Sequence, residues 1–367
     1  MEGETGVEAM SESATLQQWT GEPRLPEVIH HHYGIKLKEA RPVGGVLRLK
    51  TDQGTYGLKR VHEREELRWK LLRELAEHIS ETEWIRIPSP VLTRHQGITV
   101  AGRRRKYVLL PWIEGEVKDL RKGNRWAQVA RVLARFHSAS KGFSPSIRSR
   151  GLSHTGKWET IWQDLTQQVH MFKLAADLSA EPEPVDHLWL RQCSYIEGML
   201  ETALRYLQKM GGDEVVRSTR GGGEACHCNL HRRNLIWGNG DEVHLIDWNR
   251  LILDVRSREL ARFLLYAYGR TGSLEPITAI LKAYQETAPL EEAEYGLIYA
   301  QLLFPHRLLR SLSRIYREQK IPSHLAEGHL SSTLGQEEKK EGLLREFPEW
   351  IQREFNVSIP RVDWLRK

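Results

Sequence analysis

Residues 226–248 read CHCNLHRRNLIWGNGDEVHLIDW, and this stretch decides how the rest of the chain is interpreted. A polar loop from His227 to Asn234 leads into a short apolar run, an Asn-Gly turn signal and a second apolar run that ends at Asp247. Two apolar runs around an Asn-Gly turn predict a β-hairpin. The hairpin would hold Asn234 and Asp247 at adjacent strand ends, where an amide oxygen and a carboxylate can share a Mg²⁺ ion.

The order of polar residues in this stretch resembles the catalytic loop of kinase-like phosphotransferases. That loop has a His, a catalytic Asp two residues later and an Asn five residues after that, and a metal-binding Asp follows on the next hairpin. The matching positions here are His227, Asn229, Asn234 and Asp247. The stretch therefore looks like the aminoglycoside/choline kinase-like superfamily, in which the loop usually reads H-G-D and the metal-binding Asp lies in I-D-W or I-D-F.

A second segment narrows the resemblance. Residues 136–143 read FHSASKGF and resemble the same region of the CotS family of bacterial spore coat proteins, its YsxE-like members in particular. We interpret His137 in this segment as a buried hydrogen-bonding residue. The likeness extends over residues 25–355. It implies cytoplasmic synthesis, a place in the spore coat and other spore coat proteins as partners.

Asn229 departs from the pattern, because a carboxylate is expected at its position. An amide cannot accept a proton as a carboxylate does, and loss of a general base costs about 10² to 10⁴-fold in rate. One hypothesis is a kinase-fold spore coat protein with a degenerate phosphotransferase site that acts in coat assembly. The alternative is an active ATP-dependent phosphotransferase for a small-molecule acceptor, with His231 as a substitute base. A plain helical scaffold with an accidental likeness is the third.

Upstream, an alternating segment predicts three strands at residues 37–42, 46–51 and 55–61. Gly44 and Gly45 form the first turn, where the kinase-like fold covers the phosphates of its nucleotide. Backbone amides without side chains can approach phosphate closely. A plain hairpin turn is the other interpretation of the two glycines.

On the third strand, the resemblance implies that Lys59 contacts the α- and β-phosphates of ATP and pairs with a glutamate on the following helix. We expect that helix at residues 63–79, with Glu74 as the partner and Glu66 as the alternative. Solvated surface glutamates are the competing interpretation. Together with the metal ligands Asn234 and Asp247, this implies weak binding of ATP and Mg²⁺.

The predicted fold class is α+β, a bilobal protein-kinase-like fold with a small antiparallel-sheet lobe and a large, mainly helical lobe. We expect a disordered N-terminus over residues 1–20, a nucleotide-binding lobe over 21–115 and a helical lobe with the catalytic-type loop over 116–367. The boundary follows a hinge-like strand at residues 107–115. In that fold the hinge backbone reads the adenine edge.

Composition excludes other classes of protein. The chain has 367 residues, 40% of them hydrophobic and 28% charged, which is typical of a globular domain with a substantial core. We expect no membrane span and no signal peptide. The net charge is +6, but the basic run at residues 103–106 is interpreted as a solvated hairpin turn, so no nucleic-acid partner is expected. Three cysteines form no disulfide framework, and the Cys226-x-Cys228 pair with His227 and His231 is too closely spaced for a usual zinc site.

Overall fold

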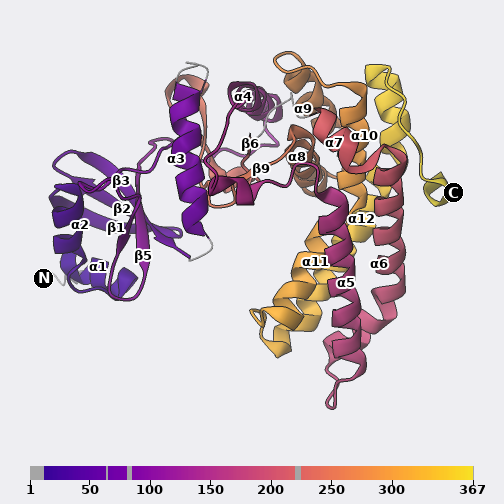
Figure 1. Ribbon diagram of the computed structural model, residues 1–367, viewed down its shortest axis with the longest axis horizontal. Coiled ribbons are helices and arrows are strands. Elements are labelled where there is room, and N and C mark those ends of the chain that lie inside the picture. The colour runs from indigo at the N-terminus through magenta and orange to yellow at the C-terminus, as the bar shows by residue number, and fades with distance from the viewer. Residues whose placement is uncertain (1–11, 63–64, 81–84, 220–224, 367) are drawn as a thin grey trace, which may run out of the picture. The chain divides into compact units, whose positions relative to one another are not determined.

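The protein's structure is a computed structural model that describes residues 12–62, 65–80, 85–219 and 225–366. The chain forms two compact units (Figure 1). What we call the sheet unit consists of residues 1–118, 143–152 and 233–251. What we call the helical unit consists of residues 119–142, 153–232 and 252–367.

The sheet unit is built on an antiparallel sheet with the strand order β1-β2-β3-β5-β4 (Figure 1). The strands are β1 Leu37–Val43, β2 Val46–Thr51, β3 Gly54–Val61, β4 Thr99–Ala101 and β5 Lys106–Pro111. The strands β1, β2 and β3 each lie within one residue of their predicted bounds. Lys59 of β3 is opposite Val46 on one side and Val108 on the other, so its backbone is held by two neighbouring strands.

Two N-terminal helices pack with the sheet, α1 (Glu12–Thr20) and α2 (Leu25–Tyr33). The expected disorder of residues 1–20 is therefore wrong for residues 12–20, and residues 1–11 lie outside the described part of the chain. Leu16 is completely buried in the sheet unit's core, and the Arg60 guanidinium lies 4.0 Å from the centre of the Trp19 ring. Leu16 and Trp19 lie three residues apart on one face of α1, and their packing anchors a segment that is otherwise polar.

Helix α3 (Glu66–Ser80) follows β3 and buries an apolar stripe, consisting of Trp69, Leu71, Leu72, Leu75 and Ile79. Its spacing is that of a helix with one face against a core. The prediction of a helix at residues 63–79 is confirmed from Glu66 onward, and residues 63–64 lie outside the described ranges.

The predicted hairpin at the catalytic-type loop is present as β7 (Leu235–Trp237) and β8 (Val243–Leu245), which pair antiparallel. The backbone of Glu116 exchanges two hydrogen bonds with that of Trp237, at 2.9 and 3.0 Å. Beside this bridge Gly115 has φ +148°, and a Cβ atom there would lie 2.3 Å from the Trp237 carbonyl oxygen. Only glycine fits at this close approach of two backbones.

The helical unit consists mainly of helices with two short strands. They are α4 Arg125–Ala139, α5 Trp158–Asp177, α6 Pro184–Lys209, α7 Gly212–Ser218, β6 Ala225–Cys226, β9 Ile252–Leu253, α8 Arg256–Thr271, α9 Glu275–Gln285, α10 Glu292–Leu303, α11 His306–Leu312 and α12 Ser323–Phe355. The strands β6 and β9 pair antiparallel and fix the chain immediately before the catalytic-type loop.

Helix starts in this unit follow local sequence signals. At the start of α6, Glu183 and Asp186 form a capping box and Pro184 occupies the first turn. Helix α12 begins at Ser323, directly after a proline. Helix α11 is followed directly by a π-helical turn, Ser313–Arg317.

The helices in the described ranges include none with the length and hydropathy of a membrane span.

Candidate functional site

The sheet unit brings Lys59 and Asp247 together, although they are 188 residues apart in the sequence. The Lys59 ammonium group donates a hydrogen bond to Oδ1 of Asp247 and forms an ion pair with it. Both side chains are partly exposed, with 14% and 28% of their surface accessible. Because an ion pair at this depth is only partly screened by water, the two charges hold each other in place.

Burial lowers the pKa of the Lys59 ammonium group to about 8, while the negative charge of Glu65 opposes this shift and Arg250 adds to it. The ammonium group also lies 5.6 Å from the centre of the Trp69 ring, on α3. Lys59 is therefore still mainly a cation at neutral pH, in surroundings where its attraction for phosphate is stronger than in water.

Asn234 and Asp247 flank the same end of the β7–β8 hairpin. The carbonyl oxygen of Asn234 accepts a hydrogen bond of 3.0 Å from the backbone N–H of Ile246, which extends the strand pairing by one step. Asp247 follows with φ +67°, a left-handed conformation that Asp and Asn tolerate better than other residues. The hairpin therefore offers an amide oxygen and a carboxylate, the donor types that suit Mg²⁺.

Gly44 and Gly45 form the two-residue turn between β1 and β2, where Val43 pairs with Val46. Gly44 has φ +59°, and both glycines are exposed with open space where a Cβ atom would be. This geometry is that of a tight hairpin turn with freely accessible backbone. It is consistent with either interpretation of the two glycines.

The expected partnership of Lys59 with Glu74 is replaced by other contacts. The Glu74 carboxylate accepts hydrogen bonds from the backbone and hydroxyl of Ser146, at 3.0 and 2.7 Å, and from the hydroxyl of Ser149 at 3.2 Å. The alternative, Glu66, forms an ion pair with Lys106. Glu74 lies on the α3 face that meets residues 143–152, and this orientation gives it serine hydroxyl groups as partners in place of Lys59.

The helical unit holds the first part of the loop, with His227 and Asn229. The imidazole Nδ1 of His227 accepts a hydrogen bond of 3.1 Å from the backbone N–H of Asn229. An accepting Nδ1 leaves the ring proton of a neutral His227 on Nε2. Because His227 is completely buried, it positions the backbone of the residue that stands where the catalytic carboxylate is expected.

Glu259, on α8, holds the same loop through hydrogen bonds. The sequence did not predict this role for Glu259. Its carboxylate accepts hydrogen bonds of 2.7 Å from the backbone N–H groups of both His227 and Cys228. Burial would raise the pKa of this carboxyl group, but hydrogen bonds from His137 and from the Cys228 backbone outweigh burial and keep it low. The only sequence signal was an acidic residue in the first turn of a helix that is otherwise packed all round.

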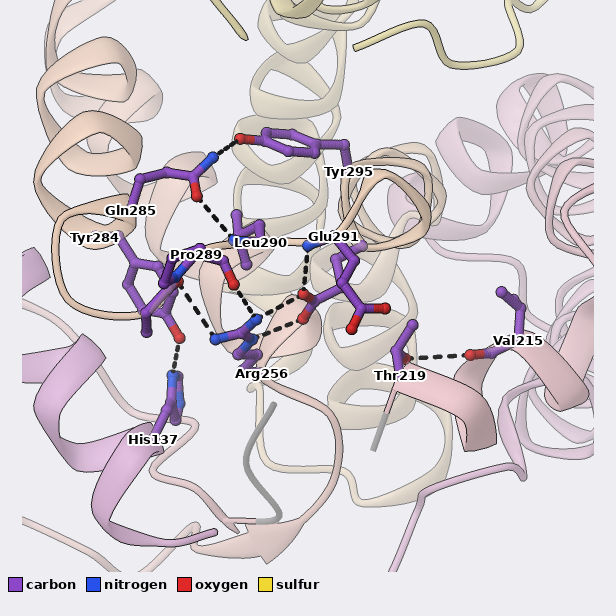
Figure 2. Close-up of polar contacts among 12 residues, drawn as sticks. His137, Val215, Thr219, Arg256, Tyr284, Gln285, Pro289, Leu290, Glu291 and Tyr295 are labelled. Carbon is purple, nitrogen blue, oxygen red and sulfur yellow. Dashed lines mark hydrogen bonds and ion pairs between the residues drawn. The ribbon is translucent and has the colours of Figure 1, made fainter. Parts of the chain in front are cut away.

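A chain of polar contacts extends from Glu259 into the helical unit, and Figure 2 shows it from His137 onward. His137 Nε2 lies 3.2 Å from Glu259 Oε2, and its Nδ1 lies 2.7 Å from the hydroxyl of Tyr284. The guanidinium of Arg256 lies beside the Tyr284 ring and forms a buried two-pronged ion pair with Glu294, at 2.6 and 2.7 Å. The prediction that His137 is a buried hydrogen-bonding residue is thus confirmed, and the loop is tied to α4, α9 and α10.

Comparison with known proteins shows which family the chain belongs to. A family model described as "Spore coat putative kinase YutH" matches residues 26–347. The chain belongs to this family. The YutH-family chain is also similar to spore coat protein S of Bacillus subtilis (strain 168), with 22% identity over 324 residues, which are 87% of this chain and 91% of that protein.

Solved structures share the fold of this YutH-family protein. An aminoglycoside phosphotransferase from Alicyclobacillus acidocaldarius subsp. acidocaldarius DSM 446 has a TM-score of 0.69 at 18% identity, with 89% of this chain and 96% of that chain covered. The AMP-bound complex of spectinomycin phosphotransferase, APH(9)-Ia, has a TM-score of 0.59 at 17% identity, with 87% and 98% covered.

These findings confirm the predicted fold class, a kinase-like phosphotransferase fold with an antiparallel-sheet part and a mainly helical part. They also confirm the predicted resemblance to spore coat proteins of the aminoglycoside/choline kinase-like superfamily. The matching family carries the YutH name, whereas the sequence suggested the YsxE-like members.

Proposed function

We propose that this YutH-family protein is a spore coat protein with a degenerate phosphotransferase site, which binds MgATP weakly and acts in assembly of the coat. The observation that carries the proposal is a difference between the two units in the residues expected of such a site. The sheet unit pairs Lys59 with Asp247. The helical unit has Asn229 where a carboxylate would take a proton.

The nucleotide-binding part of the proposal rests on the sheet unit. Lys59 supplies a desolvated cation for the α- and β-phosphates, and Asn234 and Asp247 would hold Mg²⁺ through oxygen atoms. The metal ion would neutralise phosphate charge when bound. The accessible backbone of Gly44 and Gly45 is suited to covering the phosphates. AMP in the complex of the spectinomycin phosphotransferase supports a nucleotide as the ligand.

The proposed loss of phosphoryl transfer rests on the loop of the helical unit. Phosphoryl transfer needs the acceptor hydroxyl to be oriented and its proton removed. The carbonyl oxygen of Asn229 can accept a hydrogen bond from a hydroxyl, so orientation is retained. An amide does not take up the proton, so transfer is slow.

The role in coat assembly is supported by the family and by the similarity to spore coat protein S. A protein that binds ATP without transferring its phosphate stays in the ATP-bound form. Its partners would then be other spore coat proteins.

A second function has one observation in its favour. His231 is half-buried in the same loop, two residues after Asn229, and an imidazole can act as a general base near neutral pH. With His231 as the base, the protein would be an active phosphotransferase for a sugar, aminoglycoside or amino alcohol.

Thermal unfolding with and without millimolar MgATP tests nucleotide binding. The unmodified protein should be stabilised in proportion to the logarithm of ligand concentration. Asp247→Asn should remove the Mg²⁺-dependent part, because it keeps the side-chain shape and tolerates the left-handed backbone while removing the charge. Glu242→Gln is the matched control, since it removes one negative charge from an exposed position on the same hairpin.

A phosphotransfer assay over sugars, aminoglycosides and amino alcohols separates the two functions. The degenerate site should show turnover near the background in the presence of bound nucleotide. Rapid transfer to any of these acceptors by the unmodified protein would contradict the degenerate site and establish the second function. An unfolding midpoint that ignores MgATP would contradict nucleotide binding itself.

A further inference from the structure

A fully buried cluster beneath the catalytic-type loop carries the donor types of a transition-metal site. One nitrogen of His137, the thiol sulfur of Cys226 and one carboxylate oxygen of Glu259 lie within 4.8 Å of one another. They come from α4, β6 and α8, three separate segments of the helical unit. This is a different set from the Cys226, Cys228, His227 and His231 set considered from the sequence.

The separation of the nitrogen and oxygen atoms matches a shared metal ion. Ligand atoms about 2.0–2.1 Å from a tetrahedral Zn²⁺ ion are about 3.3 Å apart, and a nitrogen and a sulfur ligand are about 3.6 Å apart. His137 Nε2 and Glu259 Oε2 are 3.2 Å apart. The Cys226 sulfur lies 3.5 Å from the carbonyl oxygens of Asp254 and Val255, which are weak contacts for a thiol. Turning this sulfur toward the histidine and carboxylate therefore gives up little.

The buried thiol of Cys228 lies next to the cluster in the sequence but is not one of its donors, because among the described residues only His137, Cys226 and Glu259 have donor atoms within 4.8 Å of one another. The cluster therefore contains three donors, a nitrogen, a sulfur and an oxygen, which are the donor types of a zinc-type site.

Neighbouring groups hold the side chains of the cluster in position. The Nδ1 atom of His137 lies 2.7 Å from the Tyr284 hydroxyl, so the ring has a partner on the side away from Glu259 (Figure 2). Metal-bound histidines usually have such an outer partner, which fixes the ring and its tautomer. Glu259 is oriented by the backbone N–H groups of His227 and Cys228, and each carboxylate oxygen has a second lone pair for a metal ion.

We propose that His137, Cys226 and Glu259 form a Zn²⁺ site that fixes the catalytic-type loop to the core of the helical unit. Binding displaces the Cys226 thiol proton to solvent, and the sulfur coordinates as a thiolate. The site joins the residues immediately before Asn229 to α4 and α8. Its role is structural, because all three donors are buried.

Cobalt titration of the full-length protein tests the site directly. The protein is first treated with a chelator and a reductant, and CoCl₂ is then added. We expect visible d–d bands of tetrahedral intensity and a thiolate-to-cobalt charge-transfer band, both saturating at one Co²⁺ per chain. One equivalent of ZnCl₂ should abolish both bands.

Variants assign the ligands. Cys226→Ser and His137→Gln should each lose the charge-transfer band or its tetrahedral pattern, whereas Cys193→Ser should keep both. Cys193 is the matched control, because it is a buried free cysteine on α6 outside the cluster. Far-ultraviolet circular dichroism of each metal-free variant shows whether it is folded, and Glu259→Gln replaces any variant that is not.

Two results would overturn the site. One is a folded, reduced, unmodified protein that gives no thiolate-to-cobalt band with excess CoCl₂. The other is a Cys226→Ser variant whose bands equal those of the unmodified protein. Because the readout involves no nucleotide, its outcome is independent of whether the protein binds ATP or transfers phosphate.

Discussion

The sheet unit and the helical unit differ in how closely they match the residues expected of a kinase-like site. In the sheet unit, Lys59 is desolvated and paired with Asp247, so the charged groups that would meet phosphates and metal are present and in contact. In the helical unit, hydrogen bonds to His227 and Glu259 hold the backbone of the loop, but the loop has Asn229 where a carboxylate is expected.

This difference shows that the groups that position the loop are distinct from the side chain that would accept a proton. The hydrogen bonds that position the backbone at residue 229 come from buried groups and do not depend on which side chain residue 229 carries. A single change from carboxylate to amide at a half-buried position therefore removes a proton acceptor without disturbing the fold.

The largest expected effect restores the missing group. Asn229→Asp should raise nucleotide turnover by about 10² to 10⁴-fold, because it supplies a positioned general base of nearly identical shape. The rate of ATP consumption with an acceptor panel measures this, and ATP affinity is measured alongside since a second carboxylate attracts cations. Asn239→Asp adds the same charge at an exposed turn of the hairpin and should change nothing. An Asn229→Asp protein that binds nucleotide but does not turn it over would show that residues other than Asn229 also prevent phosphoryl transfer.

The support of the loop is tested by Glu259→Ala. The change leaves the backbone N–H groups of His227 and Cys228 buried without their acceptor, and each such group costs about 1–3 kcal/mol. We expect the free energy of unfolding to fall by about 3 kcal/mol, as measured by denaturant titration. Glu275→Ala, an exposed acidic residue in the first turn of α9, should stay within about 0.5 kcal/mol. Equal losses in the two variants would mean that Glu259 contributes only as a helix-start acid.

Glycine substitutions compare the two units by backbone alone. Gly115→Ala should destabilise the protein by about 1–3 kcal/mol, since alanine meets both the positive φ and the Trp237 carbonyl oxygen. Gly198→Ala, at an exposed site of α6 with open space around it, should stabilise by about 0.5–1 kcal/mol. Thermal unfolding of both variants shows whether each change raises or lowers the stability. A Gly115→Ala protein as stable as the unmodified protein would show that the backbone contact can open.

The smallest effect concerns pH and the sheet unit. The pKa of Lys59 is lowered to about 8, so its positive charge is present below that pH and is lost as pH rises through it. MgATP affinity should therefore fall by about tenfold between pH 7 and 9, following the fraction of protonated lysine. Lys59→Arg should bind with a flat profile over this range, because arginine stays charged. A flat profile in the unmodified protein would exclude Lys59 as the phosphate contact.

Strand and helix patterns near the site were predictable because short-range signals decided them. The alternation around Lys59 and the Asn-Gly turn before Asp247 fixed both the sheet and the hairpin. The partner of Glu74 was not predictable, because Ser146 lies 72 residues away and nothing local indicates which face of α3 it meets. Glu259 was missed for the same reason, since a carboxylate that accepts backbone N–H groups has no sequence pattern of its own.

The way the sheet unit is assembled from three separate segments has a consequence during synthesis. Its sheet is complete once residue 118 has been made, but the hairpin that carries Asp247 leaves the ribosome more than a hundred residues later. Until then Lys59 lacks its counter-ion, whereas Glu74 gains its partner Ser146 earlier, from the second segment. Nascent chains of this protein should therefore acquire protease resistance in their first segment late, after residue 251 has emerged, and a fragment ending at residue 118 should remain cleavable.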